Sequence, residues 1–137
     1  MRGGTGNDVL GGGTGADRLI GGTSADRFDF DFISDSAAGG IDVIAAGDGA
    51  IAFEGVGVRG GDVIDLSTID ANANFAGNQT LSWSTSKTDG TVYLANSNGS
   101  TVLYGHTNND GQADFALVIA DGASISAGNY TSDEFIL

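Results

Sequence analysis

Residues 3–11, 12–20 and 21–29 read GGTGNDVLG, GGTGADRLI and GGTSADRFD, three consecutive segments of nine residues. Each segment begins Gly-Gly-Thr, has an aspartate at its sixth position and a large apolar residue at its eighth. The aligned aspartates are Asp8, Asp17 and Asp26, and the aligned apolar residues are Leu10, Leu19 and Phe28. A constant period with one apolar position in every copy predicts a solenoid, in which each segment forms half a coil and the apolar side chains stack inside.

The pattern Gly-Gly-x-Gly-x-Asp-x-apolar-x resembles the nonapeptide of the repeats-in-toxin proteins, which form calcium-binding parallel β-rolls. Ser24 is a departure, because it stands where the third copy should have glycine. Calcium takes about six to eight oxygen ligands from carboxylates and backbone carbonyls together. Turns on one edge of such a solenoid are two repeats apart, so we expect Asp8 and Asp26 to face each other across one ion.

The resemblance also implies which residues would bind several Ca²⁺ ions. In that family one turn contributes carbonyls from positions two and four, and the next turn on the same edge contributes positions one and three. The implied ligands of the most complete site are Gly4, Gly6, Asp8, Gly21, Thr23 and Asp26. On the opposite edge they are Gly13, Gly15 and Asp17, with Asp35 and Asp42 as candidates for the partner turn. The alternative, a flexible linker with solvated aspartates, needs no apolar residue at a fixed period.

Strand-like patterns continue after the repeats. Strands are expected over residues 28–33, 63–66, 91–94, 101–104, 113–120 and 135–137. The sequence Asn96-Ser97-Asn98-Gly99 predicts a hairpin turn, and residues 67–70 have the spacing of a short helical turn. The predicted fold is all-β, a parallel β-roll (solenoid) at the N-terminus that continues into an antiparallel, β-sandwich-like cap. We expect one module over residues 1–137, with the nonapeptide roll in residues 1–35 and the cap in residues 36–137.

A second resemblance covers much of this later region. The segments GDVIDLSTIDAN (residues 61–72), GHTNNDGQADF (residues 105–115) and the final DEFIL (residues 133–137) are similar to the C-terminal domain of serralysin-type secreted metalloproteases. This resemblance implies a module that is exported by a type I secretion apparatus and is covalently linked to an upstream catalytic domain. It also implies that the uncleaved C-terminus carries the secretion signal, although an ordinary last strand explains the same residues.

The loop at residues 106–114 has a spacing like that of an EF-hand. Asn108, Asp110, Gly111 and Asp114 stand where positions three, five, six and nine of such a loop would be. Its first position is His106, and neutral imidazole is a poor ligand for a hard cation. Calcium binding by Asn108, Asp110 and Asp114 and a plain Asn-Asp-Gly turn therefore both remain open.

Composition narrows the possible functions. The chain of 137 residues has 24 glycines, no proline, no cysteine and a net charge of −13. Nucleic acids and anionic membranes attract positive charge, so neither is an expected partner. No apolar run is long enough to predict a membrane span. With a single histidine and no His-Glu-x-x-His sequence, a serralysin-like zinc site is excluded, and we expect no enzymatic activity in this chain.

Two functions from different classes follow. The first is a non-catalytic, calcium-binding module of a secreted bacterial enzyme, which folds outside the cell when it meets calcium and stabilises its parent. The second is a carbohydrate-binding module of a polysaccharide-acting enzyme, similar to the repeats of alginate epimerases. Arg18, Arg27 and Arg59 would then contact uronate carboxylates, with Arg18 and Arg27 along one face. Trp83, Tyr93 and Tyr104 are candidates for stacking on sugars, with sheet packing as the alternative.

Overall fold

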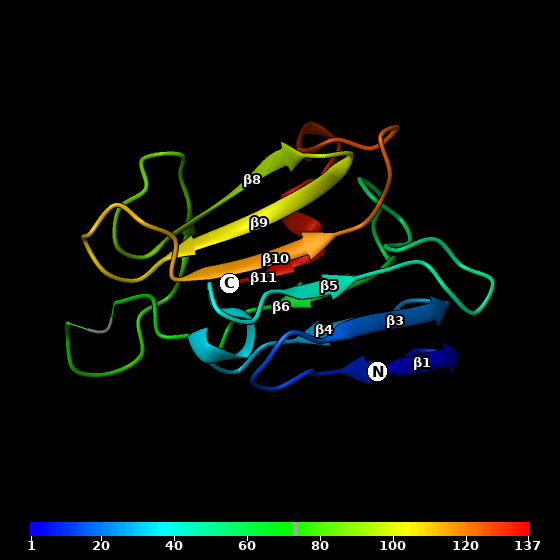
Figure 1. Cartoon of the computed structure of the whole chain (residues 1–137), viewed down its shortest axis with the longest axis horizontal. Helices are drawn as coiled ribbons and strands as arrows, with labels where there is room; N and C mark the ends of the chain where they lie inside the picture. Colours follow the sequence, from blue (N-terminus) through cyan, green and yellow to red (C-terminus); the bar gives the residue numbers. More distant parts are fainter. Residues whose placement is uncertain (73) are drawn as a thin grey trace.

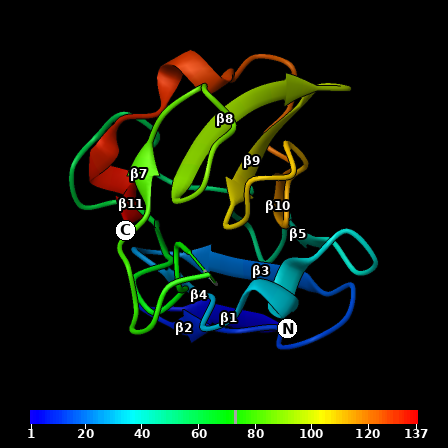
Figure 2. The same cartoon turned by 90° about the vertical axis from the view of Figure 1, so that its left-hand side faces the viewer.

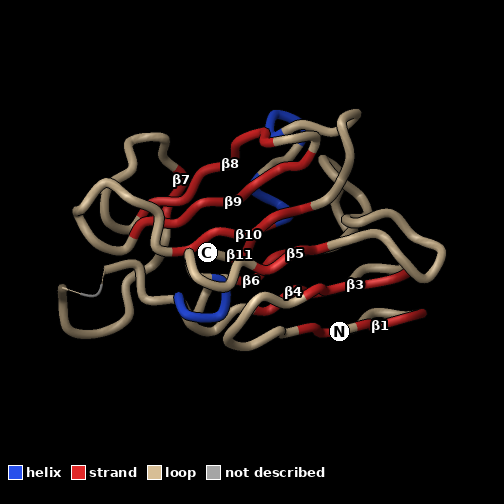
Figure 3. Tube along the Cα trace, viewed as in Figure 1, coloured by secondary structure: helices blue, strands red, loops and turns tan. Residues whose placement is uncertain are grey.

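A computed structural model describes residues 1–72 and 74–137 and contains two β-sheets (Figures 1 and 3). The first sheet has the strand order β1-β3-β5-β10-β9-β8-β7, and the second has the order β11-β6-β4-β2. The strands are β1 (Arg2–Thr5), β2 (Val9–Leu10), β3 (Arg18–Thr23), β4 (Arg27–Asp29), β5 (Asp42–Ile44), β6 (Val63–Asp65), β7 (Ser82–Trp83), β8 (Thr91–Ser97), β9 (Ser100–His106), β10 (Phe115–Ile119) and β11 (Phe135–Ile136). The predicted all-β fold is confirmed.

Consecutive strands of the N-terminal half alternate between the two sheets. β1 pairs with β3 in parallel, with Arg2 opposite Ile20, and β2 pairs with β4 in parallel, with Val9 opposite Arg27. Both offsets are eighteen residues, which is two nonapeptides, because each nonapeptide completes half a coil. The parallel β-roll predicted from the repeats is therefore present, and its coils are visible at the blue end of the chain in Figure 1.

The apolar residues of the repeats form two ladders that face each other inside the roll. In the second sheet Leu10 lies opposite Phe28, Phe28 lies opposite Ile64, and Ile64 lies opposite Phe135. In the first sheet the ladder consists of Leu19, Ile44 and Ile119. All of these side chains are buried in one continuous core, so burial of a single position per half-coil holds the layers together.

The later coils contain longer insertions. β4 pairs with β6 at an offset of thirty-six residues, since Phe28 lies opposite Ile64. The strand expected over residues 28–33 ends at Asp29, and a 3-10 helix, η1 (Ile33–Ser36), follows. Asp35 caps this helix by accepting hydrogen bonds from the backbone N–H groups of Asp31 and Phe32 at 3.0 Å each. The helical turn expected at residues 67–70 is instead a tight turn, in which Asp65 accepts from the N–H of Ser67 at 2.9 Å.

The cap extends the first sheet. The predicted hairpin is present as β8 and β9, and Asn98 and Gly99 take φ values of 50° and 75° at its turn. β10 pairs with β9 in antiparallel and with β5 in parallel, which joins the cap to the roll. Two further 3-10 helices, η2 (Ala127–Asn129) and η3 (Ser132–Glu134), lead to β11 (Figure 2). β11 pairs with β6 in parallel. No helix among residues 1–72 and 74–137 is long and apolar enough to cross a bilayer.

Candidate cation-binding turns

The aspartates of the repeats are stacked in the turns that lead into the strands. Asp26 Oδ1 accepts a hydrogen bond from the backbone N–H of Asp8 at 2.9 Å. Asp62 Oδ1 accepts from the N–H of Asp26, also at 2.9 Å. Asp8, Asp26 and Asp62 therefore form one ladder along an edge of the roll, in the turns before β2, β4 and β6. We call these three residues the first aspartate ladder.

A second aspartate ladder lies on the opposite edge. Asp42 Oδ1 accepts from the backbone N–H of Asp17 at 2.8 Å. Asp42 is completely buried, and its backbone N–H donates to the Ser36 hydroxyl at 2.8 Å. Of the two candidates for the partner of Asp17, the structure thus brings Asp42 to it, whereas Asp35 caps η1.

Three carboxylate oxygens of the two ladders have no hydrogen-bond partner. Asp8 Oδ2, Asp26 Oδ2 and Asp42 Oδ2 are buried and accept no hydrogen bond from the described residues. A buried polar atom without a partner costs about 1–3 kcal/mol, and more when it carries charge. Three such oxygens at equivalent repeat positions are therefore an arrangement that a positively charged ligand would stabilise.

The surroundings of these carboxylates oppose their ionisation. Burial, together with the nearby carboxylate of Asp17, raises the pKa of Asp42 to about 6. Burial likewise raises the pKa of Asp26, with smaller contributions from the charges of Asp8 and Glu54, and hydrogen bonding from the Asp8 backbone partly opposes this increase. A cation between the stacked carboxylates would favour their charged forms.

The first glycine of each repeat leaves room for these oxygens. A Cβ atom on Gly3 would lie 2.6 Å from both Asp8 Oδ2 and the carbonyl oxygen of Gly21. A Cβ atom on Gly12 would lie 2.8 Å from Asp42 Oδ2. Both distances are shorter than van der Waals contact, so only glycine fits there. Asp8 Oδ2 and the Gly21 carbonyl, two of the expected ligands, therefore flank one small cradle beside Gly3.

The second and fourth repeat positions all adopt left-handed backbone conformations. Their φ values are 106° and 97° at Gly4 and Gly6, 74° and 118° at Gly13 and Gly15, and 103° and 90° at Gly22 and Ser24. Ser24 thus keeps the repeat geometry although it is not glycine, and its backbone N–H donates to Glu54 Oε2 at 3.1 Å. Of the expected carbonyl ligands, Thr23 O also accepts from the N–H of Gly6 at 3.2 Å.

The donor set suits a hard cation that takes oxygen ligands. Among the described residues no three acidic or histidine side chains converge, so each ladder layer offers carboxylates in pairs. A cation in these turns would draw its remaining ligands from backbone carbonyls, which is the mixture that calcium accepts. Zinc sites, by contrast, use sulfur, nitrogen or carboxylate side chains as four close ligands.

Asp62 and Gly40 are site residues that the repeat pattern missed. Asp62 Oδ1 receives the Asp26 N–H, and its Oδ2 receives the Glu54 N–H at 2.8 Å, so this carboxylate closes the first aspartate ladder. Gly40 packs directly on the backbone of Gly15. The signal was the shorter pattern Asp-Val-Ile, which recurs in residues 42–44 and 62–64 after the glycines of the nonapeptide have faded.

The loop at residues 106–114 uses its polar atoms internally. Asp114 accepts from the Thr107 N–H at 2.8 Å and from Asn108 Nδ2 at 2.6 Å. Asn108 Oδ1 accepts from the Asp110 N–H at 3.1 Å, and Asp110 Oδ1 accepts from the Gln112 N–H at 2.8 Å. His106 is buried beneath the loop and stacks on Tyr93. These contacts favour the alternative of a plain hairpin turn between β9 and β10.

The arginines do not form the shared face that their repeat positions predicted. Arg18 lies on β3 in the first sheet and Arg27 on β4 in the second, because successive nonapeptides alternate between sheets. Arg27 is bound to Asp65 at 2.6 Å and to Asp29 at 3.2 Å. Arg59 pairs with Asp133 at 3.2 Å. The aromatic trio also divides, since Tyr93 stacks on Tyr104 while Trp83 packs against Phe135.

Comparison with known proteins identifies a structural relative. The solution structure of the AlgE6R3 subunit from the Azotobacter vinelandii mannuronan C5-epimerase matches this chain with a TM-score of 0.58 and 26% sequence identity. The match covers 98% of this chain and 65% of that structure, so the chain spans less than two thirds of that structure's length. No family model matches the chain. No curated protein sequence matches it either. The chain is thus a β-roll module whose fold is similar to that of this epimerase subunit.

Proposed function

We propose that the chain is a non-catalytic, calcium-binding module of a longer secreted protein. The observation that carries this proposal is the set of buried, unpartnered oxygens Asp8 Oδ2, Asp26 Oδ2 and Asp42 Oδ2, which are stacked in glycine turns that no other residue would fit. The ligands in the first aspartate ladder are Gly4, Gly6, Asp8, Gly21, Thr23 and Asp26. Those in the second are Gly13, Gly15, Asp17 and Asp42.

Calcium would supply the positive charge that offsets burial of these carboxylates. The chain's own contribution is to hold two aspartates one layer apart and to shape each turn so that carbonyls can join them. With few buried apolar side chains per half-coil, the roll has a small core to offset its conformational entropy. Binding energy therefore becomes folding energy, and the module would stay loose in calcium-poor cytosol and fold at the millimolar calcium of extracellular fluid.

Calcium titration tests this function. We expect chelated protein to gain β-sheet circular dichroism and to melt at a higher temperature as calcium is added. Asp26→Asn and Asp42→Asn each remove one carboxylate charge from a different ladder, so each is expected to weaken calcium binding by about tenfold or more in calorimetry. Asp133→Asn is the matched control, because Asp133 is exposed and pairs with Arg59 away from both ladders. Identical melting with and without chelator would refute the proposal.

The parent protein is proposed to be a secreted enzyme that acts on a polysaccharide, and the likeness to the epimerase subunit supports this over a serralysin-type protease. By the serralysin resemblance, the final DEFIL would carry a type I secretion signal as well as form β11. Fusing residues 1–137 or residues 1–132 to a reporter in a host with a type I exporter separates the two roles. Equal export of both fusions would remove the signal function from the tail.

A second candidate function is anchoring to a polysaccharide, and it too is favoured by the epimerase relative. Arg18 is the arginine whose guanidinium contacts only a backbone carbonyl, that of Ala46, among the described residues. The other arginines are paired with carboxylates, so a uronate polymer would have to displace them or be bridged by calcium. Saturable retention on an alginate column in calcium supports anchoring, and a flat binding isotherm removes it.

A further inference from the structure

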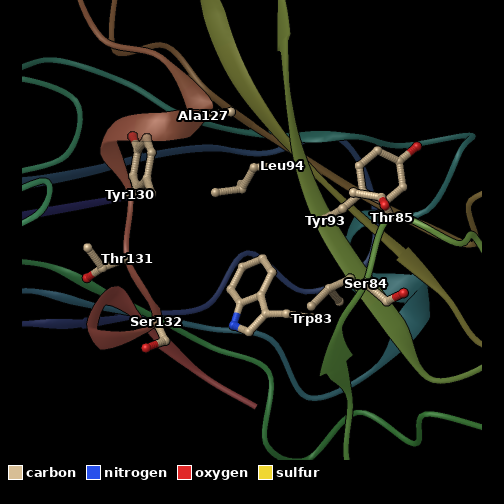
Figure 4. A pocket seen from close by; sticks show the side chains of 10 residues that line it. Trp83, Ser84, Thr85, Tyr93, Leu94, Ala127, Tyr130, Thr131 and Ser132 are labelled. Carbon is tan, nitrogen blue, oxygen red and sulfur yellow. The ribbon is translucent and has the colours of Figure 1, made fainter.

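A pocket of about 400 Å³ opens between the strands of the cap and the C-terminal segment, well outside the aspartate ladders (Figure 4). This volume lies within the range of sites for small ligands. The residues that line it include Trp83, Leu94, Tyr130, Thr131 and Ser132. We call it the Trp83 pocket. The strands β7 and β8 form one wall, and η2, η3 and the residues between them form the other.

Two aromatic side chains are held in fixed positions around this pocket. Trp83 is 39% exposed, and its ring packs edge-on against Phe135 with centroids 4.9 Å apart. Tyr130 is almost buried, and its hydroxyl donates to Asp121 Oδ2 at 2.8 Å. Figure 4 shows Trp83 and Tyr130 beside the same opening, with Leu94 between them. A large exposed indole supported from behind offers a stacking surface that is ready before any ligand arrives.

The neighbouring aromatic pair lies on the other side of β8. Tyr93 stacks on Tyr104 with ring centroids 5.3 Å apart, and Lys87 Nζ lies 5.9 Å from the Tyr93 centroid. Side chains alternate along a strand, so Tyr93 points away from the side that carries Leu94, as Figure 4 shows. Lys87 is therefore separated from the Trp83 pocket by the strand.

The charges near the pocket disfavour an anionic ligand. Glu134 is buried just behind Thr131 and accepts from its N–H at 2.6 Å and its hydroxyl at 3.1 Å. Asp121 accepts from the Tyr130 hydroxyl, whereas Asp133, which follows the lining residue Ser132, is paired with Arg59 at 3.2 Å. Trp83 and Ser132, which carry an indole N–H and a hydroxyl, both line the opening.

We infer that the Trp83 pocket binds a ring of a neutral polysaccharide. The apolar face of a pyranose would stack on Trp83, and its hydroxyls would bond with the indole N–H and Ser132. The carboxylates of Glu134 and Asp121 behind the wall argue against a uronate, and no lysine or arginine is among the lining residues. This inference goes beyond the proposed calcium function and names a different ligand class from the uronate of the anchoring candidate, and it does not depend on the calcium ligands.

The single tryptophan of the chain makes a direct test possible, because all indole fluorescence reports on this pocket. Calcium-saturated protein is titrated with cellohexaose, with xylohexaose and with an oligomannuronate of six residues. We expect at least one neutral oligosaccharide to shift the emission in a saturable manner that is insensitive to salt. The oligomannuronate is expected to cause no saturable shift.

Variants then locate the site. In calorimetry Trp83→Ala is expected to weaken binding by about tenfold, the scale of one lost aromatic stack. Ser132→Tyr fills the opening without disturbing the core and is expected to abolish binding even if Trp83→Ala folds poorly. Tyr104→Ala, an aromatic substitution on the opposite side of β8, is expected to leave affinity unchanged.

Three results would overturn the inference. They are no fluorescence change with either neutral oligosaccharide, unchanged binding by Ser132→Tyr, and tighter, salt-dependent binding of the oligomannuronate. Circular dichroism of the same samples with and without chelator keeps this outcome distinct from the calcium proposal. If the module folds on calcium but does not bind neutral oligosaccharides, only the inference about the Trp83 pocket is wrong. If it binds them and its folding does not change with chelator, only the calcium proposal is wrong.

Discussion

At the scale of single residues, Ser24 carries a backbone conformation that glycine would adopt with less strain. Its φ of 90° matches the glycines at the same repeat position, Gly6 and Gly15, whose φ values are 97° and 118°. A side chain in this left-handed region costs on the order of 1 kcal/mol, because Cβ approaches the backbone oxygen. The surrounding turn therefore imposes the conformation on Ser24 against its own preference.

The substitution Ser24→Gly is expected to stabilise the folded module by about 0.5–1 kcal/mol, since relief of strain exceeds the added flexibility of the unfolded chain. Urea unfolding in saturating calcium measures the difference. Gly15→Ser, at the equivalent position of the second repeat, is the matched control and is expected to destabilise by a similar amount. If both substitutions shift the midpoint in the same direction, backbone strain is not the cause.

At the scale of secondary-structure elements, Glu134 fastens the last strand to the roll. Its Oε1 accepts from the Gly57 N–H at 2.6 Å, and its Oε2 accepts from the Thr131 N–H at 2.6 Å. The carboxylate is buried, and the next residue, Phe135, lies opposite Ile64 of β6. One side chain thus joins β11, the loop before β6 and the wall of the Trp83 pocket.

We expect Glu134→Ala to destabilise the module by about 2–3 kcal/mol, because it removes a buried carboxylate and leaves the N–H groups of Gly57 and Thr131 without their charged acceptor. Chemical unfolding followed by circular dichroism gives this value. The neighbouring Asp133→Ala removes only an exposed ion pair with Arg59 and is expected to change stability by less than about 1 kcal/mol. A small effect of Glu134→Ala would show that β11 is held by its apolar contacts alone.

At the scale of the whole molecule, buried acids make the calcium-free fold sensitive to pH. Burial raises the pKa of both Asp42 and Asp62 to about 6. The pKa of an aspartate in an unfolded chain is about 3.9. Between these two values the folded state holds more protons than the unfolded state, so stability falls as pH rises. The stability that these two raised pKa values contribute is fully present below about pH 4 and is lost above about pH 6.

In the presence of chelator, the urea midpoint is therefore expected to be higher at pH 4.5 than at pH 7. In saturating calcium the order is expected to reverse, because protons and cations compete for the same carboxylates. Asp62→Asn is expected to flatten the calcium-free profile, since it removes one of the two titrating groups. A calcium-free midpoint that rises steadily from pH 4.5 to pH 7 would contradict these assignments.

The sequence alone determined the parts of the molecule that repeat. A period of nine residues with Asp8, Asp17 and Asp26 predicted parallel coils, the inward position of Leu10, Leu19 and Phe28, and the eighteen-residue offset that the strand pairing confirms. The hairpin of β8 and β9 was also predictable, because Asn98 and Gly99 adopt the positive φ values of a hairpin turn and this preference is local to the two residues. Local chemistry repeated at a fixed interval leaves few alternatives for the backbone.

Only the tertiary structure decided which distant residues complete these local patterns. Asp42 and Asp62 join the ladders after insertions that interrupt the nonapeptide period. Because the lengths of these insertions vary, the period no longer predicts which aspartate occupies the next layer. The Trp83 pocket joins β7 and β8 to a segment some forty residues later, and Glu134 is buried only because β11 returns to β6. Such contacts depend on how the layers pack in three dimensions, which brings together residues that are far apart in the sequence.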